Sequence, residues 1–277
     1  MRSDRGVRSV QLGVHDVMAD QGSIVVKIGG STLGEGDSTI DDVVELWSRG
    51  MRPVVVHGGG KTISEWVSRQ GVRSQFVRGL RVTDSATLEV AVAVLTGLVN
   101  SNLVAEITRA GGPAVSVSGV SEGMFSAVIQ DPELGYVGRI EKTNPLPVQV
   151  IVDSGRIPVV GPAALNLEAT SLEDQILNIN ADTAAGHLAR ALKAESMVFQ
   201  TDVEGVLDMR GRVIPQMTKR QCVDLINSGV AGGGMIPKLE ACIESLGGTK
   251  SAHIIDGRVK GALVKCVEGE PIGTRIV

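Results

Sequence analysis

The sequence predicts an α/β protein, a three-layer αβα sandwich around an open, mainly parallel sheet with β-hairpin lid elements. From residue 24 onward, short runs of β-branched residues alternate with longer segments of helical periodicity, which is typical of parallel strands joined by helical crossovers. Glycine clusters directly follow two of these strands. A third region, residues 119–147, is divided by glycines into short stretches, which indicates hairpins instead of another crossover.

The first half of the chain supplies three strands and three helices in alternation. We expect strands at 24–28, 54–56 and 114–118, and helices at 38–49, 62–70 and 85–110. The last of these is the longest apolar helical pattern. It is followed by Gly111 and Gly112, and glycine commonly ends a helix.

The α/β pattern resumes after the hairpin region. A strand is expected at 158–160, a helix starts within the NINADTAA stretch, and further strands are expected at 196–201 and 253–256. We divide the chain into an N-terminal arm, an N-terminal lobe and a C-terminal lobe, with the bounds 1–22, 23–195 and 196–277. The arm carries valines at roughly helical spacing, so both a short docking helix and a partly ordered tail fit its sequence.

The composition argues against several classes of function. The 277 residues are 43% hydrophobic, which is enough for a sizeable core. The formal net charge of −4, with three Phe, two Trp and one Tyr, argues against nucleic-acid binding. Every apolar run is interrupted well before the ~18 residues of a membrane span, and the N-terminus lacks an apolar signal segment. We therefore expect a cytoplasmic protein with no membrane contact.

The cysteines and histidines give no metal-ligand pattern. Cys222, Cys242 and Cys266 are widely spaced without a CxxC pair, so we expect reduced structural thiols. The four histidines are equally scattered, at positions 15, 57, 187 and 253. A resident metal is therefore not expected, and a metal ion would arrive only with a nucleotide.

Two glycine turns predict an anion site. Gly29 and Gly30 follow the first strand, and Gly58, Gly59 and Gly60 follow the second. Such turns expose backbone N–H groups at the ends of parallel strands, which suits a phosphate.

Two short motifs in this region admit other interpretations. The GKT at residues 60–62 is not a Walker A end, because Val55 occupies the position of the required glycine. The HGGG at 57–60 together with the GxSxG at 119–123 would suit a serine hydrolase with Ser121 as nucleophile. That alternative requires His187 or His253 as its base.

Three charged residues suit phosphoryl chemistry. Lys27 ends the first strand just before a glycine turn, and Lys238 follows a second glycine run at the start of a helical pattern. Either lysine alone is most simply a solvated surface charge. If the two converge, Asp182 between them would reduce their repulsion and fix both ammonium groups.

With these residues in view, the chain resembles the amino acid kinase family, and within it the kinases of N-acetyl-L-glutamate. The matching stretches follow in the family's order from residue 24 to the end of the chain. They are VVKIGGS (25–31), VVVHGGGK (54–61), FVRGLRVTD (76–84), GYVGRI (135–140), LNINADTAA (177–185), TDVEGVLD (201–208), GGGMIPKLEAC (232–242) and AHIIDGR (252–258).

The resemblance implies ATP-dependent phosphorylation of the side-chain carboxylate of N-acetyl-L-glutamate in arginine biosynthesis, with Mg²⁺ accompanying ATP and no tightly bound cofactor. It implies that Lys27 and Lys238 stabilise the phosphoryl group, that Asp182 orders them, and that Gly29 and Gly30 bind phosphate. Acceptor-binding residues would be Gly58, Gly59, Arg81 and Asn178. ATP-binding residues would be Thr201, Asp202, Gly205, Leu207, Gly233 and Met235.

The absence of an obvious general base agrees with this chemistry. A carboxylate has a reference pKa near ~4.3, so the nucleophile is already ionised at pH 7. The nearest alternative within the family is a kinase of a carrier-protein-linked aminoadipate or glutamate, in lysine or ornithine biosynthesis. The resemblance also implies a homodimer. The other assembly is a hexamer, formed from dimers that join through an N-terminal helix.

Overall fold

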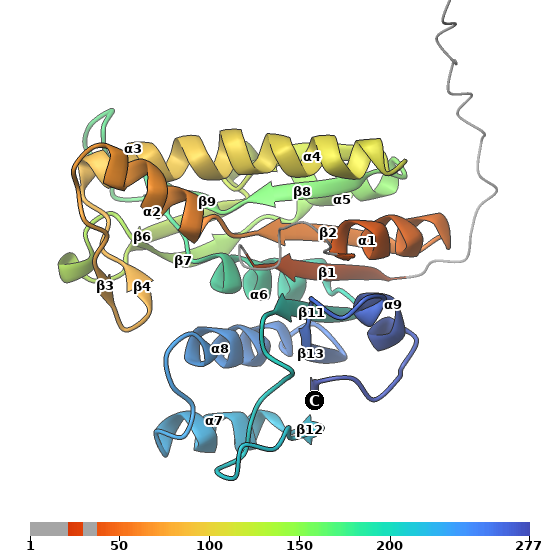
Figure 1. Ribbon diagram of the computed structural model, residues 1–277. Coiled ribbons are helices and arrows are strands. Elements are labelled where there is room, and N and C mark those ends of the chain that lie inside the picture. Colours follow the sequence, from red (N-terminus) through yellow and green to blue (C-terminus); the bar gives the residue numbers. More distant parts are fainter. Residues whose placement is uncertain (1–21, 30–37) are drawn as a thin grey trace, which may run out of the picture.

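The computed structural model describes residues 22–29 and 38–277 (Figure 1). The predicted arm up to residue 21 and the predicted phosphate ligand Gly30 lie outside the described residues. The strands are β1 (Ser23–Ile28), β2 (Arg52–His57), β3 (Phe76–Val77), β4 (Leu80–Arg81), β5 (Ala114–Ser118), β6 (Phe125–Ile129), β7 (Gly138–Thr143), β8 (Ile157–Gly161), β9 (Ala163–Asn166), β10 (Ile176–Asn178), β11 (Ser196–Thr201), β12 (Gln216–Met217), β13 (Ser251–Asp256) and β14 (Thr274–Ile276).

The α-helices are α1 (Thr39–Ser48), α2 (Gly60–Arg69), α3 (Ser85–Val92), α4 (Asn100–Arg109), α5 (Leu146–Asp153), α6 (Ala181–Leu192), α7 (Lys219–Asn227), α8 (Met235–Ser245) and α9 (Ala262–Val267). A π-helical segment, η1 (Ala93–Val99), joins α3 to α4, and two short 3₁₀ turns are η2 (Ser121–Gly123) and η3 (Pro132–Leu134).

The main sheet has eight strands in the order β12-β14-β13-β11-β1-β2-β8-β5. Its neighbours pair in parallel except for β13 and β14. From β1 the chain builds outward through β2 on one side and later through β11 on the other. The carboxyl ends of β1, β2 and β11 therefore meet where the direction of winding reverses, which is where open α/β sheets bind ligands. The expected lobe boundary at residue 195 lies just before β11, and the sheet continues across it.

Alternate residues of each central strand enter two different cores. In β1, Val25 packs with α5, α6 and α8, whereas Ile24 and Val26 pack with α1, α4 and α9. A strand buried on both faces needs apolar residues at every position, and the β-branched runs supply them. This arrangement confirms the predicted three layers, which Figure 1 shows with the long α3–η1–α4 helix along one face.

The predicted hairpin region is confirmed as β6 and β7, which pair antiparallel within a four-stranded sheet of order β10-β9-β6-β7. Close packing requires glycine at two positions of this region. A Cβ on Gly119 would lie 2.0 Å from the Ala163 carbonyl oxygen, and one on Gly135 would lie 2.4 Å from that of Thr83. The first approach joins the end of β5 to β9 of the hairpin sheet, and the second joins the β6–β7 connection to the segment that leads into α3.

The long predicted helix is confirmed over Ser85–Arg109, with a π-helical segment that the apolar spacing did not indicate. By length and composition this helix could cross a membrane, since its mean hydropathy reaches 1.7. Within the fold, 44% of that apolar window is buried, and α4 turns Leu103 and Ile107 into the core. These buried residues form the apolar stripe by which a helix packs on a core.

Candidate active site

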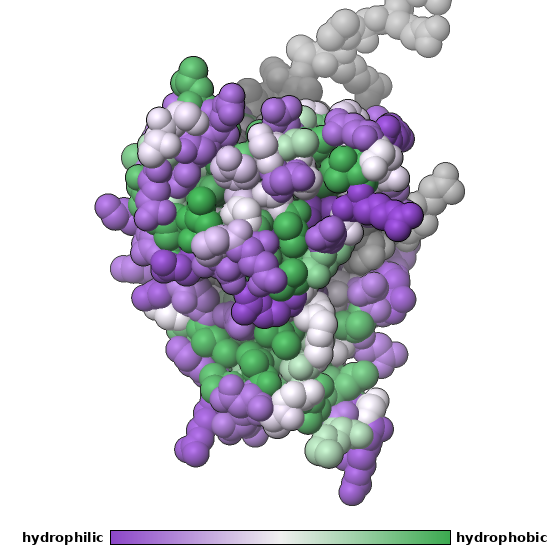
Figure 2. Space-filling view, turned by 90° about the vertical axis from the view of Figure 1, so that its left-hand side faces the viewer, coloured by the Kyte–Doolittle hydropathy of each residue, from purple (hydrophilic) through white to green (hydrophobic). Residues whose placement is uncertain are grey.

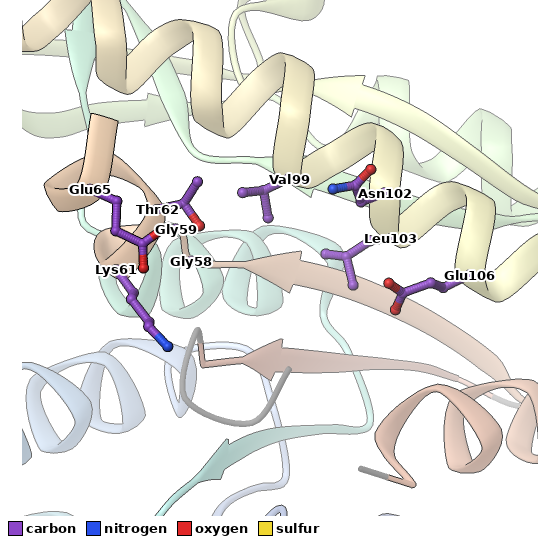
Figure 3. A pocket seen from close by; sticks show the side chains of 9 residues that line it. All are labelled: Gly58, Gly59, Lys61, Thr62, Glu65, Val99, Asn102, Leu103 and Glu106. Carbon is purple, nitrogen blue, oxygen red and sulfur yellow. The ribbon is translucent and has the colours of Figure 1, made fainter. Parts of the chain in front are cut away.

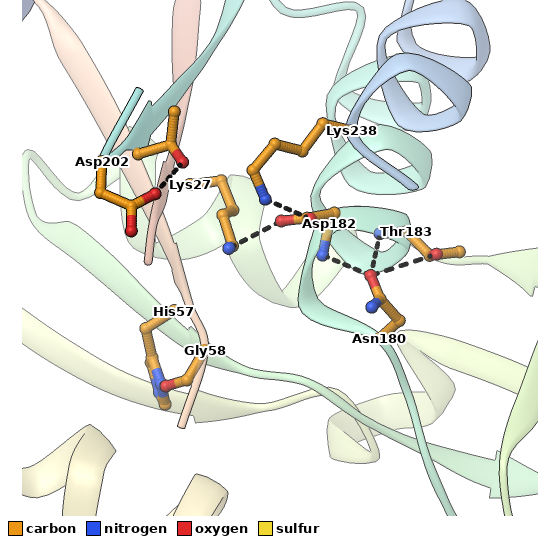
Figure 4. Close-up of polar contacts among 9 residues, drawn as sticks. Lys27, His57, Gly58, Asn180, Asp182, Thr183, Asp202 and Lys238 are labelled. Carbon is orange, nitrogen blue, oxygen red and sulfur yellow. Dashed lines mark hydrogen bonds and ion pairs between the residues drawn. The ribbon is translucent and has the colours of Figure 1, made fainter. Parts of the chain in front are cut away.

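Lys27, Asp182 and Lys238 converge at the carboxyl end of the sheet (Figure 4). Lys27 lies near the end of β1, Asp182 in the first turn of α6 and Lys238 in the first turn of α8. Lys27 Nζ lies 2.7 Å from Asp182 Oδ1 as an ion pair, and Lys238 Nζ donates a 2.9 Å hydrogen bond to Oδ2. The two lysines, whose convergence the sequence left open, therefore meet at one carboxylate.

The three side chains are nearly withdrawn from water, at 9%, 8% and 16% exposure for Lys27, Asp182 and Lys238. Burial alone would raise the pKa of Asp182, but the charges and hydrogen bonds of the two lysines outweigh it and hold that pKa below its ordinary value. One carboxylate between two ammonium groups leaves the cluster with a net positive charge. Such a cluster favours an anionic ligand.

Asp182 is held in place by its helix start. Asn180 caps α6, because its side-chain oxygen accepts hydrogen bonds from the backbone N–H groups of Asp182 at 2.9 Å and Thr183 at 3.1 Å. An asparagine just before an acid in the first helical turn is a recognisable cap pattern. Asn180 was not among the residues predicted from the sequence, although this signal could have identified it.

Lys238 is brought to Asp182 by close packing of α6 against α8. A Cβ on Gly186 would lie 2.7 Å from the Ala241 carbonyl oxygen, so these helices touch through their backbones. Gly186 is one turn beyond Asp182, and Ala241 is one turn beyond Lys238. The glycine therefore sets the separation across which the ion pair forms.

A cavity of about 190 Å³ brings together the four predicted acceptor-binding residues, Gly58, Gly59, Arg81 and Asn178. Asn180 and Ala181, at the start of α6, line it as well. The cavity therefore adjoins the turn that carries Asp182. Figure 2 views the molecule from the side of β3 and β4 and shows hydrophilic and hydrophobic residues intermixed on this face.

Arg81 is buried and held by neutral groups. Its guanidinium donates to the Gly60 carbonyl oxygen at 2.7 Å and to the hydroxyls of Ser64 and Ser74 at 2.8 and 2.6 Å, and it lies over the Phe76 ring. Among the described residues, no carboxylate pairs with it. A buried guanidinium without an internal counter-ion is suited to a carboxylate supplied by a ligand.

The Gly58–Gly59 turn also borders a second cavity, of about 310 Å³, between the start of α2 and α4 (Figure 3). Lys61, Thr62 and Glu65 line it from α2, and Figure 3 shows Asn102 and Glu106 facing it from α4. The turn therefore lies between two cavities.

The predicted nucleotide-binding residues occupy two segments of the C-terminal part. Thr201 ends β11, and Asp202, Gly205 and Leu207 follow it; Gly233 and Met235 lie at the start of α8. Gly205 and Gly233 have φ of 159° and 51°, and the latter suits glycine best. A Cβ on Gly79 would lie 3.8 Å from the Gly233 carbonyl oxygen, so the glycine run before α8 neighbours the β3–β4 turn.

The hydrolase alternative finds no triad in the described residues. Ser121 lies in η2, and the described histidines are engaged elsewhere. His57 bonds to Gly58 and Asn100, His253 to the Ser251 hydroxyl, and His187 lies 3.7 Å from a Glu244 oxygen. Gly119 of the GxSxG pattern is explained by packing instead. The described residues therefore give no support to the serine hydrolase interpretation.

The cysteines are buried free thiols, as predicted. Burial raises the pKa of Cys222 to about 11 and that of Cys266 to about 12, and it raises the pKa of Cys242 strongly. Thiols of this kind are poor nucleophiles. Within residues 22–29 and 38–277, no group of three His, Cys, Asp or Glu side chains is arranged to hold a metal ion.

Comparison with known proteins gives a family match over most of the chain. Residues 22–256 match the model of the amino acid kinase family. An acetylglutamate kinase of Dehalococcoides mccartyi is 38% identical, with 92% of this chain and 94% of that protein covered, and one of Methanothrix thermoacetophila is 42% identical, with 91% of each covered. A solved Streptococcus mutans structure superposes with a TM-score of 0.77 at 28% identity, covering 92% of this chain and 98% of that one.

Proposed function

The chain belongs to the amino acid kinase family, and we propose that it uses ATP to phosphorylate the side-chain carboxylate of N-acetyl-L-glutamate in arginine biosynthesis. One observation carries this proposal: the buried Lys27–Asp182–Lys238 cluster adjoins a cavity lined by Arg81 and Asn178. A cationic cluster beside a carboxylate-binding pocket has the parts that an acyl phosphate synthesis requires.

In the proposed reaction, an oxygen of the acceptor's side-chain carboxylate attacks the γ-phosphorus of ATP. The new O–P bond forms as the bond from that phosphorus to the bridging oxygen breaks, and ADP leaves with the electron pair. No proton is transferred, because the acceptor carboxylate is ionised at neutral pH. The two lysines stabilise the charge on the transferring group, and Asp182 keeps their ammonium groups in place.

The acceptor is proposed to lie in the 190 Å³ cavity. Arg81 and Asn178 would hold its α-carboxylate, and the backbone N–H of Gly59 would face its reacting end. The N–H of Gly58 is not available for this role, because it donates to the Ile28 carbonyl oxygen at 3.1 Å, so Gly58 would only line the cavity. Arg81 suits this role because its planar fork can bind two carboxylate oxygens at once.

ATP is proposed to bind as its Mg²⁺ complex, with the metal ion part of the substrate. Gly29 and Gly30 would contact its phosphates, although the N–H of Gly29 itself donates to the Gln200 carbonyl oxygen of β11 at 3.3 Å. Residues 23–195 would then bind the acceptor, and residues 196–277 would bind the nucleotide through Thr201, Asp202, Gly205, Leu207, Gly233 and Met235. The proximity of Gly233 to Gly79 supports contact between the two parts at the reaction centre.

Trapping the product with hydroxylamine tests the proposal directly. The protein with MgATP and N-acetyl-L-glutamate is expected to yield a hydroxamate, and Lys238→Ala is expected to lose most turnover while keeping its fold by circular dichroism. No hydroxamate from N-acetyl-L-glutamate, with turnover of a carrier-linked aminoadipate or glutamate, would assign the second candidate instead.

We further propose that the protein is a cytoplasmic homodimer. The alternative is a hexamer assembled from dimers. Light scattering with and without arginine, the end product of the proposed pathway, distinguishes these assemblies. A dimer whose mass does not respond to arginine would exclude an arginine-dependent hexamer.

A further inference from the structure

A buried histidine stands behind the glycine turn that separates the two cavities. His57 ends β2 and is fully buried, and its Nδ1 lies 2.9 Å from the Gly58 carbonyl oxygen (Figure 4). Its Nε2 lies 3.1 Å from the side-chain nitrogen of Asn100, the first residue of α4. That nitrogen also donates to the Val159 carbonyl oxygen of β8 at 2.9 Å.

These contacts determine the proton positions. The Asn100 amide nitrogen donates one hydrogen to Val159 and the other to His57, so Nε2 must be an unprotonated acceptor. The Nδ1 nitrogen then carries the proton and donates it to Gly58. Reversing the Asn100 amide would place its oxygen against the Val159 carbonyl, so only one orientation makes both hydrogen bonds. In that orientation the Asn100 Oδ1 atom is buried without a hydrogen-bond partner among the described residues. Burial and the nearby charge of Lys27 lower the pKa of His57 to about 4, which keeps the ring neutral.

The π-helical segment brings Asn100 to this position. Leu95 lies in η1, and a Cβ on Gly59 would lie 2.8 Å from Leu95 Cδ2. Positions 95 and 100 point about 140° apart on an α-helix of 3.6 residues per turn. The i→i+5 bonding of a π-helix brings such residues to one side. Leu95 can therefore press on Gly59 while Asn100 holds the ring beside Gly58.

The Gly58–Gly59 turn, held in this way, presents backbone N–H groups to a ligand. Gly59 is the N-cap of α2, which lacks a side-chain cap. Among the described residues, no acceptor is bonded to the N–H groups of Gly59 and Gly60. Since the Gly58 carbonyl and the Gly59 N–H belong to the same peptide plane, holding the carbonyl also fixes the direction of the N–H.

We propose that His57 and Asn100 are positioning residues, which lock the Gly58–Gly59 peptide so that its N–H points at the reacting carboxylate of the acceptor. This inference rests on the function proposed above and deepens it. Neither side chain touches the substrate. They act only through this peptide. Their loss should therefore weaken binding of the acceptor and leave binding of ATP unchanged.

Two substitutions of His57 separate its two hydrogen bonds. In His57→Asn the amide nitrogen takes the place of Nδ1 and still donates to Gly58, whereas in His57→Gln the amide oxygen takes the place of Nε2 and the donor to Gly58 is lost. We expect His57→Gln to raise the KM for N-acetyl-L-glutamate about tenfold, as for one lost hydrogen bond, with the KM for ATP unchanged. His57→Asn should stay within about threefold of the wild type for both substrates.

Asn100→Leu should raise the acceptor KM by about threefold, as His57→Asn does, because each variant loses the contact between positions 57 and 100 and keeps the donor to Gly58. Thr96→Val is the matched control on the same helix. Its hydroxyl bonds only within the helix, to the Val92 carbonyl oxygen, so both KM values should be retained. Calorimetric titration of each variant with N-acetyl-L-glutamate supplies a readout that does not depend on turnover.

Equal effects of His57→Gln and His57→Asn on the acceptor KM would overturn the inference, and so would a rise in the ATP KM that matches the acceptor's. Should either variant fail to fold, Asn100→Leu and its control decide by the same comparison. An inactive wild-type protein would instead refute the proposed function, which keeps the two failures distinct.

Discussion

The close contact between α6 and α8 gives the sharpest test of the lysine cluster. In Gly186→Ala the added Cβ would lie 2.7 Å from the Ala241 carbonyl oxygen and 3.1 Å from both its Cα and Cβ. Ordinary contacts between carbon atoms lie near ~3.5–4.0 Å, so α8 must move away by roughly 0.5–1 Å. The Lys238–Asp182 hydrogen bond of 2.9 Å would then lengthen beyond the ~3.2 Å limit of a good N–H···O bond.

Two quantities should change together in this variant. Overpacking of this kind costs about 1–3 kcal/mol, which denaturant unfolding measures as a shift in midpoint. Displacing one of the two ammonium groups from the transferring phosphoryl group should also lower kcat by about tenfold to a hundredfold. The hydroxamate assay at saturating substrates measures this loss.

Gly248→Ala is the matched control, because it places a Cβ 2.3 Å from the Arg190 carbonyl oxygen at the far end of the same helix pair. It should lower stability at least as much while keeping most of kcat. If Gly186→Ala loses stability but keeps the wild-type kcat, the close packing does not position Lys238, and our reasoning is refuted. Equal losses of kcat in both variants would refute it as well.

Three further predictions concern acceptor affinity, the pH dependence of stability and the reactivity of the thiols. Arg81→Lys should raise the acceptor KM about tenfold without changing the ATP KM, since an ammonium cannot replace the planar fork; unchanged acceptor affinity by calorimetry would exclude a role for Arg81. Stability should fall as the pH drops from about 6.5 to 4, because burial lowers the pKa of His57 and of His253 to about 4, so that protons bind preferentially to the unfolded chain. Each histidine contributes at most about 3 kcal/mol, and urea midpoints that are flat over this range would contradict the prediction. The three buried thiols should resist a thiol reagent in the native state and react together in denaturant, whereas fast native labelling would show that a cysteine is accessible.

Much of the fold follows from local pattern. The runs at 24–28 and 54–56 became β1 and β2 because strands buried on both faces require apolar residues throughout. The run at 114–118 became β5, the edge strand of the sheet, in which Ser116 is exposed. The long helix was placed within one residue of its end. Its π segment could not be read in advance, because the extra residue in the turn is set by packing against Gly59 and β8 and not by side-chain periodicity.

The site was predictable where a residue type and its place on a strand or helix define its chemistry. Lys27, Asp182 and Lys238 each lie at the end of a strand or the start of a helix. Whether they form one site depended on the tertiary structure, which brings them together. Asn180, His57 and Asn100 act through hydrogen bonds between segments, so sequence spacing alone did not reveal their partners.

The sequence by itself determined the alternation of strands and helices, the glycine turns, and which charged residues stand at strand and helix ends. Each of these depends on interactions between near neighbours in the chain. The tertiary structure decided that Lys27 and Lys238 share one carboxylate, that Arg81 is held by neutral groups, and that Asn100 fixes His57 behind the glycine turn. Those relations join residues far apart in the chain, and only the packing of the helices on the sheet sets the distances between them.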